Sequence, residues 1–444
     1  MNNLIVSRFG GNAAADSAEM KRTADIIKAD PARRYVVMSA PGSNSRSLGI
    51  TDLLYLCHSR FHNHEKYDDV LANISGRYKE IVSGLGINFN IDAEISALKG
   101  SLELGMNLDY IGSRGEYIIA KIMAEYLGWE FVDASKILFF NKDGTPDKAR
   151  TISVAGEKLK SLKHAVIPSF YGSMPDGKVK TFTRGDCDTA GALVACSVNA
   201  DMFEKWSDDA KIFSADPEVI PNSEIIRHIT YLEALEMNYI GIEIVKDDVV
   251  FMLDEAKIPM KIASTHGSED DAMTISPEIP EDNPRGVTAC IAGHKNFSIV
   301  HIRKYGVNSE AGFGEKLFSV FAKHRIPCRH YLSGIHRMSV VLKSPVFDIR
   351  RNDIIREIKE TVGAETVTVE KGLSIIAVVG EGIGTVKGVF GKIFMSLAWA
   401  GVKVQMIEQG SDKLNILIGV NDDDYEKTIK ALYEALVLNK EGYY

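Results

Sequence analysis

The N-terminal segment of the chain contains a strand, a glycine pair, a helix and a second strand in immediate succession. The apolar run Leu4–Val6 is followed by Gly10 and Gly11, then by helical spacing over Ala18–Lys28 and by a second apolar run, Tyr35–Ser39. A helix of this length is sufficient for the right-handed crossover that joins two parallel strands. We therefore expect an α/β protein built on a mainly parallel sheet with helices on both faces.

This pattern continues over the first two-thirds of the chain. Apolar residues recur at three- and four-residue spacing between Thr51 and Leu127, which predicts mostly helix. Further strands are expected at Glu130–Asp133 and Ala165–Phe170, and a helix of small residues at Ala190–Asn199. With 444 residues in the chain and about 150 residues per domain, additional domains are expected after this region.

The C-terminal third consists of two similar segments, each with a strand, a helix after a glycine-rich turn, and further strands. Phe297–Ile302 precedes the helix Gly312–His324, and Ser374–Val379 precedes the helix Val386–Ala400, with a last helix at Tyr425–Leu438. We predict one large domain over residues 1–285 and two small α+β domains over residues 286–365 and 366–444. The second small domain is expected to borrow a strand from about residues 286–293.

Composition and charge exclude several functional classes. The chain has 52 Lys and Arg against 60 Asp and Glu, and this net negative charge disfavours non-specific nucleic-acid binding. Its five cysteines form no C-x-x-C pair and no apolar run reaches the length of a membrane span, so we expect a cytoplasmic, unexported protein with no membrane partner. His324, His330 and His336 are six residues apart, which fits surface histidines and predicts no metal site.

Two turns are candidate anion sites. Arg8, Gly10 and Gly11 lie between the first strand and the first helix, where a cation, backbone N–H groups and a helix N-terminus favour a phosphate. A tight turn that needs glycine is the commoner explanation of so short a motif. The stretch 183–190 places Arg184 and Asp188 at the start of another helix, with Asp188 positioned to accept from a cation; the alternative there is a surface ion pair.

Three further features have simple structural explanations. Ser113 and Glu116 are expected to cap the start of a helix, and Asp52 to be a surface carboxylate near another helix start. Cys187 lies beside acidic residues, which disfavour the thiolate that a nucleophile needs. We therefore do not expect covalent catalysis.

A rival hypothesis concerns nucleotide binding near the C-terminus. Gly380, Gly382 and Gly384 follow a strand and precede a helix, as in a dinucleotide-binding turn, and Glu408 ends the next strand, where a ribose-binding acid is expected. Too few residues follow Glu408 to complete a mononucleotide-binding half, and the glycines fit the repeated small segment equally well. NAD binding is therefore the weaker interpretation.

Taken in order, the motifs resemble those of the aspartokinases, which belong to the amino-acid kinase family, and the resemblance covers essentially the whole chain. The opening Arg8-Phe9-Gly10-Gly11-Asn12 is similar to Lys-Phe-Gly-Gly-Thr/Ser. Further similar motifs lie at Val36–Ala40, Ile50–Leu54, Ser113–Glu116, Ser169–Gly172, Thr183–Asp188, Trp206–Asp208, Ser214–Pro217 and Gln409–Ser411. So many matches in the right order are specific for ancestry.

The resemblance implies an amino-acid kinase αβα sandwich with a mainly parallel sheet, followed by two ACT domains of the ferredoxin-like βαββαβ type. It implies an aspartate kinase, which phosphorylates the β-carboxylate of L-aspartate with ATP and Mg²⁺ to give 4-phospho-L-aspartate, the first step toward lysine, threonine and methionine. It also implies feedback control through the ACT domains by lysine or threonine. Exposed sheet edges on the small domains fit a homodimer or a dimer of dimers.

The resemblance also assigns roles to individual residues. Arg8, Gly10 and Gly11 would face the transferred phosphoryl group and the ATP phosphates, and Asp188 would orient the cations of the active site. The residues that would hold aspartate are Ser39, Thr51, Glu116 and Arg184, the last through its guanidinium. Those that would contact the nucleotide are Ser207, Asp208 and Phe213, and those that would contact an effector are Ser309, Gly312, Phe313 and Ser333.

Several positions depart from the family's pattern. Arg8 replaces a lysine, and Asn12 and Cys187 stand where hydroxyl residues are usual. The positions where negative charge replaces glycine, arginine or lysine are Asp186, Glu218 and Glu243. Added negative charge opposes the binding of a polyphosphate. The alternative hypothesis is therefore a divergent homologue with lost or altered kinase activity, which acts as an amino-acid-binding regulatory protein or uses another acidic amino acid.

Overall fold

The computed structural model describes all residues except 1–2, 44–47, 184–185, 209, 280–285 and 440–444. The chain divides into two compact units. The first comprises Met1–Ile212, Ile225–Leu235 and Ile244–Asp282, and the second comprises Phe213–Glu224, Glu236–Glu243 and Asn283–Tyr444. Among the described helices, none combines the length and hydropathy needed to cross a bilayer.

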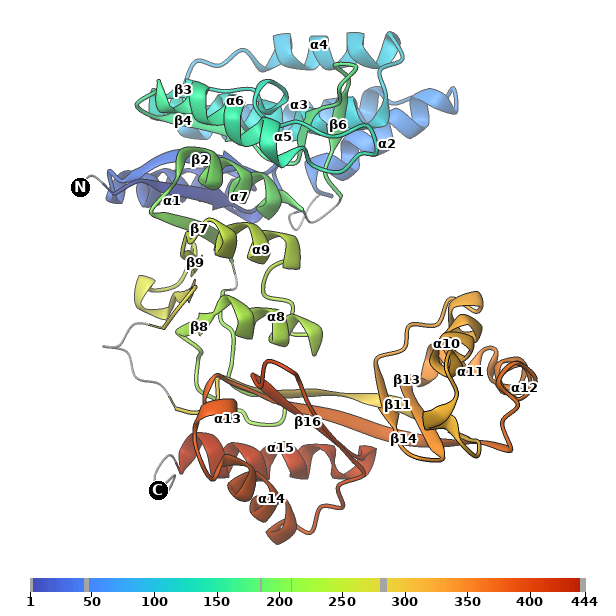
Figure 1. The fold of residues 1–444 in the computed structure, drawn as a ribbon. Coiled ribbons are helices and arrows are strands. Elements are labelled where there is room, and N and C mark those ends of the chain that lie inside the picture. Colours follow the sequence, from blue (N-terminus) through green and yellow to red (C-terminus); the bar gives the residue numbers. More distant parts are fainter. Residues whose placement is uncertain (1–2, 44–47, 184–185, 209, 280–285, 440–444) are drawn as a thin grey trace. The chain divides into compact units, whose positions relative to one another are not determined.

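The first unit is built on an eight-stranded sheet with the strand order β3-β4-β2-β1-β7-β9-β10-β8 (Figure 1). Strand β1 pairs in parallel with β2 on one side and β7 on the other, and only β10 pairs antiparallel to a neighbour, β9. The mainly parallel α/β fold expected from the sequence is confirmed. The strands are β1 (Ile5–Phe9), β2 (Arg33–Met38), β3 (Glu130–Phe131), β4 (Ala165–Pro168), β7 (Met202–Ser207), β8 (His228–Thr230), β9 (Met260–Ser264) and β10 (Met273–Ser276), with a separate hairpin of β5 (Tyr171–Ser173) and β6 (Val179–Thr181).

Helices cover both faces of this sheet because side chains alternate along its buried strands. Val36 and Met38 of β2 join a core with the helices α1 to α5, whereas Tyr35 turns to the other face, where its hydroxyl donates to the carbonyl of Leu159 in α6 over 2.7 Å. The helices are α1 (Ser17–Ala29), α2 (Ile50–His62), α3 (Asp68–Leu85), α4 (Ile91–Glu103), α5 (Leu108–Leu127), α6 (Lys148–Lys160), α7 (Cys187–Val198), α8 (Tyr231–Tyr239) and α9 (Asp247–Glu255).

The capping role expected for Ser113 and Glu116 is wrong, because both lie in the middle of α5. The helix begins after Asn107, whose side chain accepts the N–H of Tyr110 over 3.0 Å, and it ends at the left-handed Gly128. Asn107, six positions before Ser113, therefore caps the start of the helix. Ser113 and Glu116 are buried instead. Ser113 Oγ donates to the Tyr110 carbonyl over 2.7 Å within the helix, which leaves the Glu116 carboxyl to be explained by the site.

The second unit contains one six-stranded antiparallel sheet with the order β12-β13-β11-β14-β16-β15. Its two long central strands pair along their whole length, with a register shift between His294 and Phe297. The first part of β11 pairs with the part of β14 that adjoins β16, and the last part of β11 adjoins β13. The strands are β11 (Cys290–Arg303), β12 (His330–Ser333), β13 (Arg337–Lys343), β14 (Thr366–Val379), β15 (Met406–Gln409) and β16 (Asn415–Asn421).

Two hydrophobic cores lie along this sheet. One joins Val300 and Phe321 to α12, and the other joins Ile376 and Ile393 to α15. The helices are α10 (Phe313–Lys323), α11 (Ser344–Asp348), α12 (Arg351–Val362), α13 (Gly382–Thr385), α14 (Val389–Trp399) and α15 (Tyr425–Tyr433), the last continued by a π-helical turn at Glu434–Leu438. The boundaries at 286, 365 and 366 stay a prediction.

Two expectations for the C-terminal region find another explanation in this unit. A Cβ atom on Gly380 would lie 2.3 Å from the Val287 carbonyl oxygen, and one on Gly382 would lie 2.6 Å from the Val287 Cα. These glycines therefore permit close backbone packing rather than the approach of a pyrophosphate. Strand β14 also pairs antiparallel, unlike a dinucleotide-binding fold. His330 is buried, not on the surface, and its Nδ1 lies 2.9 Å from Glu408 Oε2.

Candidate active site

The glycine turn after β1 lies at the carboxyl ends of the parallel strands. The chain runs from β1 to β2 on one side and later returns to β7 on the other, so the strand order reverses at β1, where α/β proteins commonly bind ligands. Gly10 N–H donates to the Trp206 carbonyl over 3.0 Å, and Gly11 accepts from Gly42 N–H over 2.8 Å. A Cβ on Gly11 would lie 2.8 Å from the Ala40 carbonyl oxygen, so this position admits only glycine without a shift of the backbone.

Three charged side chains meet beside this turn. Arg8 Nε of β1 lies 3.2 Å from Asp188 Oδ1 in the first turn of α7, and Lys205 Nζ of β7 lies 2.9 Å from Asp188 Oδ2. The side chains are 12%, 10% and 18% exposed for Arg8, Asp188 and Lys205. Arg8 Nε and Asp188 Oδ1 are close enough for an ion pair, yet neither makes a hydrogen bond with another described group.

The protonation states of this cluster follow from its charges. Burial by itself would raise the pKa of Asp188, but Arg8 and Lys205 outweigh it and the pKa is lowered. Burial would lower the pKa of Arg8, and the neighbouring Asp188 reverses that effect, so the pKa of Arg8 is raised. The cluster therefore favours a charged Arg8 guanidinium beside a charged Asp188 carboxylate.

Lys205 was not identified from the sequence. In the parallel pairing of β1 with β7 it lies directly beside Arg8, so two cations occupy adjacent strands. A lysine between the buried Glu204 and Trp206 was the available signal, because a basic residue in an apolar strand needs a partner. Its ammonium also donates to the Ile244 carbonyl over 3.1 Å.

A second ion pair lies at the start of α7 and was also missed. Asp186, immediately before α7, pairs with Lys246, which immediately precedes α9. Asp186 is one of the positions that add negative charge relative to the family's pattern. In this structure the charge of Asp186 is balanced by the cation at the start of α9.

Ser39, Ser169 and Cys187 form a buried polar group next to the charges. Ser39 Oγ and Ser169 Oγ are 3.2 Å apart, and the Cys187 side chain interacts with both serines and with Arg8. Phe170, the residue after Ser169, has a left-handed φ of 76°, a strain that concentrates at functional sites. Burial raises the pKa of the Cys187 thiol, which is a physical reason for it not to act as a nucleophile.

Glu116 of α5 approaches the same region from the helix. It is buried, and burial raises its pKa to about 8, although the N–H of Ala40 favours its charged form. Its Oε2 makes no hydrogen bond with another described group. Electrostatic interaction with Cys187 links it to the serine group. A buried carboxyl with an unused oxygen is suited to accept a ligand's ammonium or amide donor.

The remaining expected residues are placed as follows in the first unit. Ser207 ends β7, and its carbonyl accepts the Thr265 N–H over 3.0 Å. Asp208 accepts from the Asn12 amide over 2.5 Å, so the departure at Asn12 joins the glycine turn to the end of β7. Thr51 lies half-buried in the first turn of α2. Arg184, to which the sequence assigns the substrate carboxylate, lies outside the described residues.

The other expected residues belong to the second unit. Phe213 is half-buried there, and Glu218 and Glu243 are exposed, so their charges are solvated. Ser309, Gly312 and Ser333 are exposed, whereas Phe313 packs in the core beneath α10. The N–H of Lys304 donates to His336 over 3.2 Å, which joins the loop before α10 to the β12–β13 hairpin.

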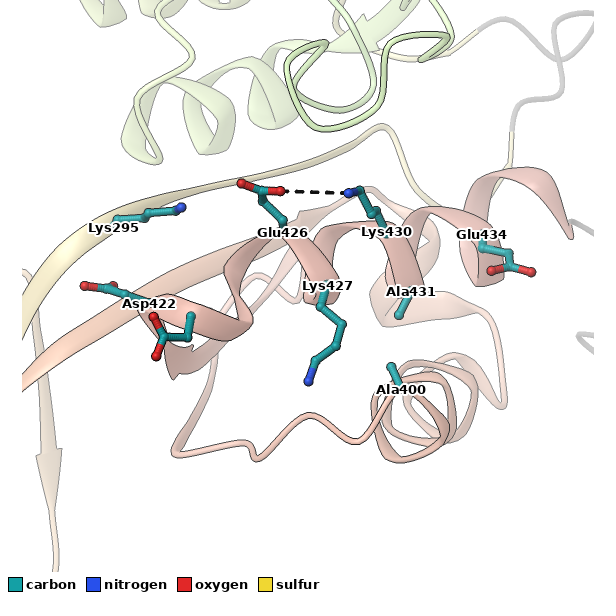
Figure 2. Close-up of a pocket in the computed structure, with 9 residues that line it drawn as sticks. Lys295, Ala400, Asp422, Glu426, Lys427, Lys430, Ala431 and Glu434 are labelled. Carbon is teal, nitrogen blue, oxygen red and sulfur yellow. Dashed lines mark ion pairs between the residues drawn. The ribbon is translucent and has the colours of Figure 1, made fainter.

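A hollow of about 700 Å³ on the second unit carries mixed charge (Figure 2). Figure 2 shows Lys427 and Lys430 on α15 between acidic side chains. Lys430 Nζ lies 3.8 Å from Glu426 Oε2, and Lys427 Nζ lies 2.6 Å from Asp424 Oδ1. Pairs one helical turn apart are typical of a solvated helix face. We assign no binding role to this hollow.

Comparison with known proteins identifies the family. The sequence profile of the amino acid kinase family matches residues 3–264, and that of the ACT domain matches residues 376–436. The chain belongs to the amino acid kinase family. The first unit carries most of the kinase match, and the second carries the ACT match.

Aspartokinases are among the relatives that span nearly the whole chain. Aspartokinase 3 of Bacillus subtilis is 29% identical over 97% of this chain and 98% of its own, and the lysine-sensitive aspartokinase 3 of Escherichia coli is 25% identical over 98% and 100%. The crystal structure of the aspartate kinase of Clostridium acetobutylicum, described as an allosteric enzyme, is 36% identical over 98% of this chain and 100% of that chain, with a TM-score of 0.91.

Proposed function

We propose that the protein is an aspartate kinase, which transfers the γ-phosphoryl group of ATP to the β-carboxylate of L-aspartate. The observation that carries the proposal is the cluster of Arg8, Asp188 and Lys205 beside Gly10 and Gly11, at the switch point of the sheet. Phosphoryl transfer depends mainly on positioning and charge neutralisation, and this cluster supplies both without a covalent residue.

The phosphate side of the site is formed by β1 and α7. Arg8 and the backbone of Gly10 and Gly11 face the transferred phosphoryl group, while Asp188 holds Arg8 and Lys205 in place. Mg²⁺ arrives with ATP as part of the substrate. Ser207 and Asp208 contact the nucleotide from the end of β7.

The aspartate side of the site is formed by β2, α2 and α5. Ser39, Thr51 and Glu116 bind the amino acid, and Arg184 binds its carboxylate. The buried Glu116 favours an acceptor with a positive ammonium group, because a charged partner stabilises its carboxylate form. An amino acid with a second carboxylate fits this combination of a buried acid and a guanidinium.

Regulation belongs to the second unit. Lysine or threonine binds near Ser309, Gly312, Phe313 and Ser333, and the protein forms a homodimer or a dimer of dimers. The edge strands β12 and β15 offer unpaired backbone groups for such pairing. The relatives do not favour the alternative of a regulatory homologue without kinase activity. The cytoplasmic location stays a prediction.

The experiment is ATP-dependent formation of aspartyl hydroxamate by the purified chain, with aspartate, glutamate and no acceptor compared. We expect turnover with aspartate and loss of aspartate use in Arg184→Ala with the fold intact by circular dichroism. Arg150→Ala is a matched control, because Arg150 packs on the Phe139 ring in the same unit. Binding of an amino acid without turnover or nucleotide binding would support the regulatory alternative.

A further inference from the structure

The ion pair between Asp186 and Lys246 occupies the start of two helices without capping either of them. Asp186 is the N-cap residue of α7, and Lys246 is the N-cap residue of α9, and neither side chain makes a capping hydrogen bond. Aspartate is among the best N-cap residues, so its side chain forgoes a favourable local contact when it turns to Lys246. The two helices pack against each other, as Figure 1 shows.

The pair is continuous with the charged cluster of the proposed phosphate site. Lys246 adds to the field that lowers the pKa of Asp188. Lys205, which pairs with Asp188, donates to the Ile244 carbonyl two residues before Lys246. The half-buried Lys205 thus ties the backbone that carries Lys246 to the cluster, which places the Lys246 ammonium at the rim of the same site.

Exposure separates Lys246 from the other two cations. Its side chain is 35% exposed, against 12% for Arg8 and 18% for Lys205. A long side chain with that exposure has more room to change its anion by rotation than the less exposed Arg8 and Lys205 have. Asp186, at 16% exposed, is held by its position in the turn before α7.

Charge balance indicates what the pair does in the absence of nucleotide. Three cations (Arg8, Lys205, Lys246) share two carboxylates (Asp186, Asp188), so the group has a net charge of one positive unit. A polyphosphate carries several negative charges, and one net positive charge does not neutralise them. Release of Lys246 from Asp186 leaves this net charge unchanged but lets the Lys246 ammonium contact the phosphates directly.

The geometry points to Lys246 as a further nucleotide-binding residue, whose ammonium binds the ATP phosphates, and to Asp186 as a resident anion that competes with the nucleotide for it. The inference rests on the proposed kinase function and adds to it a regulated cation. The two residues then have opposite effects on ATP affinity, although they form one ion pair. If the ion pair were purely structural, replacing Lys246 and replacing Asp186 would change ATP affinity in the same direction.

The test measures the KM for MgATP, the KM for aspartate, and the Kd of MgADP by calorimetry, on the full chain. We expect Lys246→Met to raise the KM for MgATP and the Kd of MgADP about 10-fold or more, and Lys246→Arg to restore them. Asp186→Asn is expected to lower both about 3-fold. The aspartate KM stays unchanged in all three. Lys257→Met is the control, because Lys257 is 68% exposed and pairs with Asp254 at 3.0 Å beyond the end of α9.

Two results would overturn the inference. One is a Lys246→Met variant whose nucleotide constants stay within twofold of the wild type; the other is an Asp186→Asn variant that weakens nucleotide binding as Lys246→Met does. Failure of the kinase function is distinguishable from these. A wild-type chain that binds MgADP but forms no aspartyl hydroxamate contradicts the function, while the Kd series still tests Lys246. A wild-type chain that binds no MgADP contradicts both.

Discussion

Arg33 Nε donates a hydrogen bond to Glu204 Oε2 over 2.8 Å, and the two side chains are only 3% and 2% exposed. The same carboxylate oxygen accepts from Ser7 Oγ over 2.8 Å and from Trp206 Nε1 over 2.9 Å. Glu204 therefore joins the three central strands β1, β2 and β7 beneath the glycine turn. It also holds Trp206, whose carbonyl accepts the N–H of Gly10.

Loss of this buried pair is expected to destabilise the first unit strongly. Glu204→Gln removes the buried counter-charge of Arg33 and leaves its guanidinium with the more exposed Glu269 at 3.3 Å, which costs on the order of 3 kcal/mol of the free energy of unfolding. Asp254→Asn breaks the exposed pair with Lys257 and is expected to cost less than about 1 kcal/mol. Urea denaturation followed by circular dichroism compares the two variants, and equal losses would contradict this role for Glu204.

The raised pKa of Glu116 predicts a pH-dependent stability. In the unfolded chain this carboxyl loses its proton near pH 4.5, but burial keeps it protonated in the folded protein up to about pH 8. The stability contributed by the group is therefore fully present below pH 4.5 and is lost as the pH rises through about 8. Glu116→Gln removes this loss, so the variant should gain on the order of 4 kcal/mol over the wild type at alkaline pH.

Urea midpoints at pH 5 and pH 8.5 check this expectation. The advantage of Glu116→Gln should be small at the lower pH and large at the higher one, while its aspartate binding is impaired at both. Glu125→Gln, on the exposed side of the same helix, is the control and should show no such dependence. An advantage independent of pH would mean that burial does not hold the proton on Glu116.

Gly10 and Gly11 are expected to differ in role, because Gly11 is required sterically and Gly10 is required for function. Gly11→Ala places a Cβ 2.8 Å from the Ala40 carbonyl oxygen, so we expect a stability loss of about 1 to 3 kcal/mol. Gly10→Ala meets its nearest neighbour, the Trp206 carbonyl oxygen, at 3.5 Å, which is ordinary contact, so its stability should change by less than about 0.5 kcal/mol. If Gly10→Ala loses ATP turnover while its thermal stability is unchanged, the phosphates of ATP must come close to the backbone at Gly10. Similar stability losses in both variants would argue against the distinction.

The candidate site residues that lie next to a recognisable turn motif could be predicted from the sequence. Arg8 and Asp188 each adjoin a glycine-containing turn between a strand and a helix, so both were recognisable. Lys205 and Lys246 were not, because their relevance depends on which strand lies beside β1 and on how α9 packs against α7. Strand order is a tertiary property that local periodicity does not encode.

The long strands of the second unit show the same limit. Phe297–Ile302 and Ser374–Val379 were predicted as separate short strands, but they are parts of β11 and β14, which pair over their full length. Polar residues at His294–Asn296 interrupt the apolar alternation where the register shifts, so a continuous strand reads as two pieces. The two similar segments consequently share one sheet.

The most direct test of the account is the turnover number of Arg8 variants in ATP-dependent aspartyl hydroxamate formation. Because Arg8 neutralises charge on the transferred group, Arg8→Met should lower kcat about 100-fold or more, and Arg8→Lys, which keeps the charge, should retain most of the activity. Both should fold, as monitored by circular dichroism. An Arg8→Met variant with wild-type kcat would contradict the claim that the cluster of Arg8, Asp188 and Lys205 is the phosphoryl-transfer site.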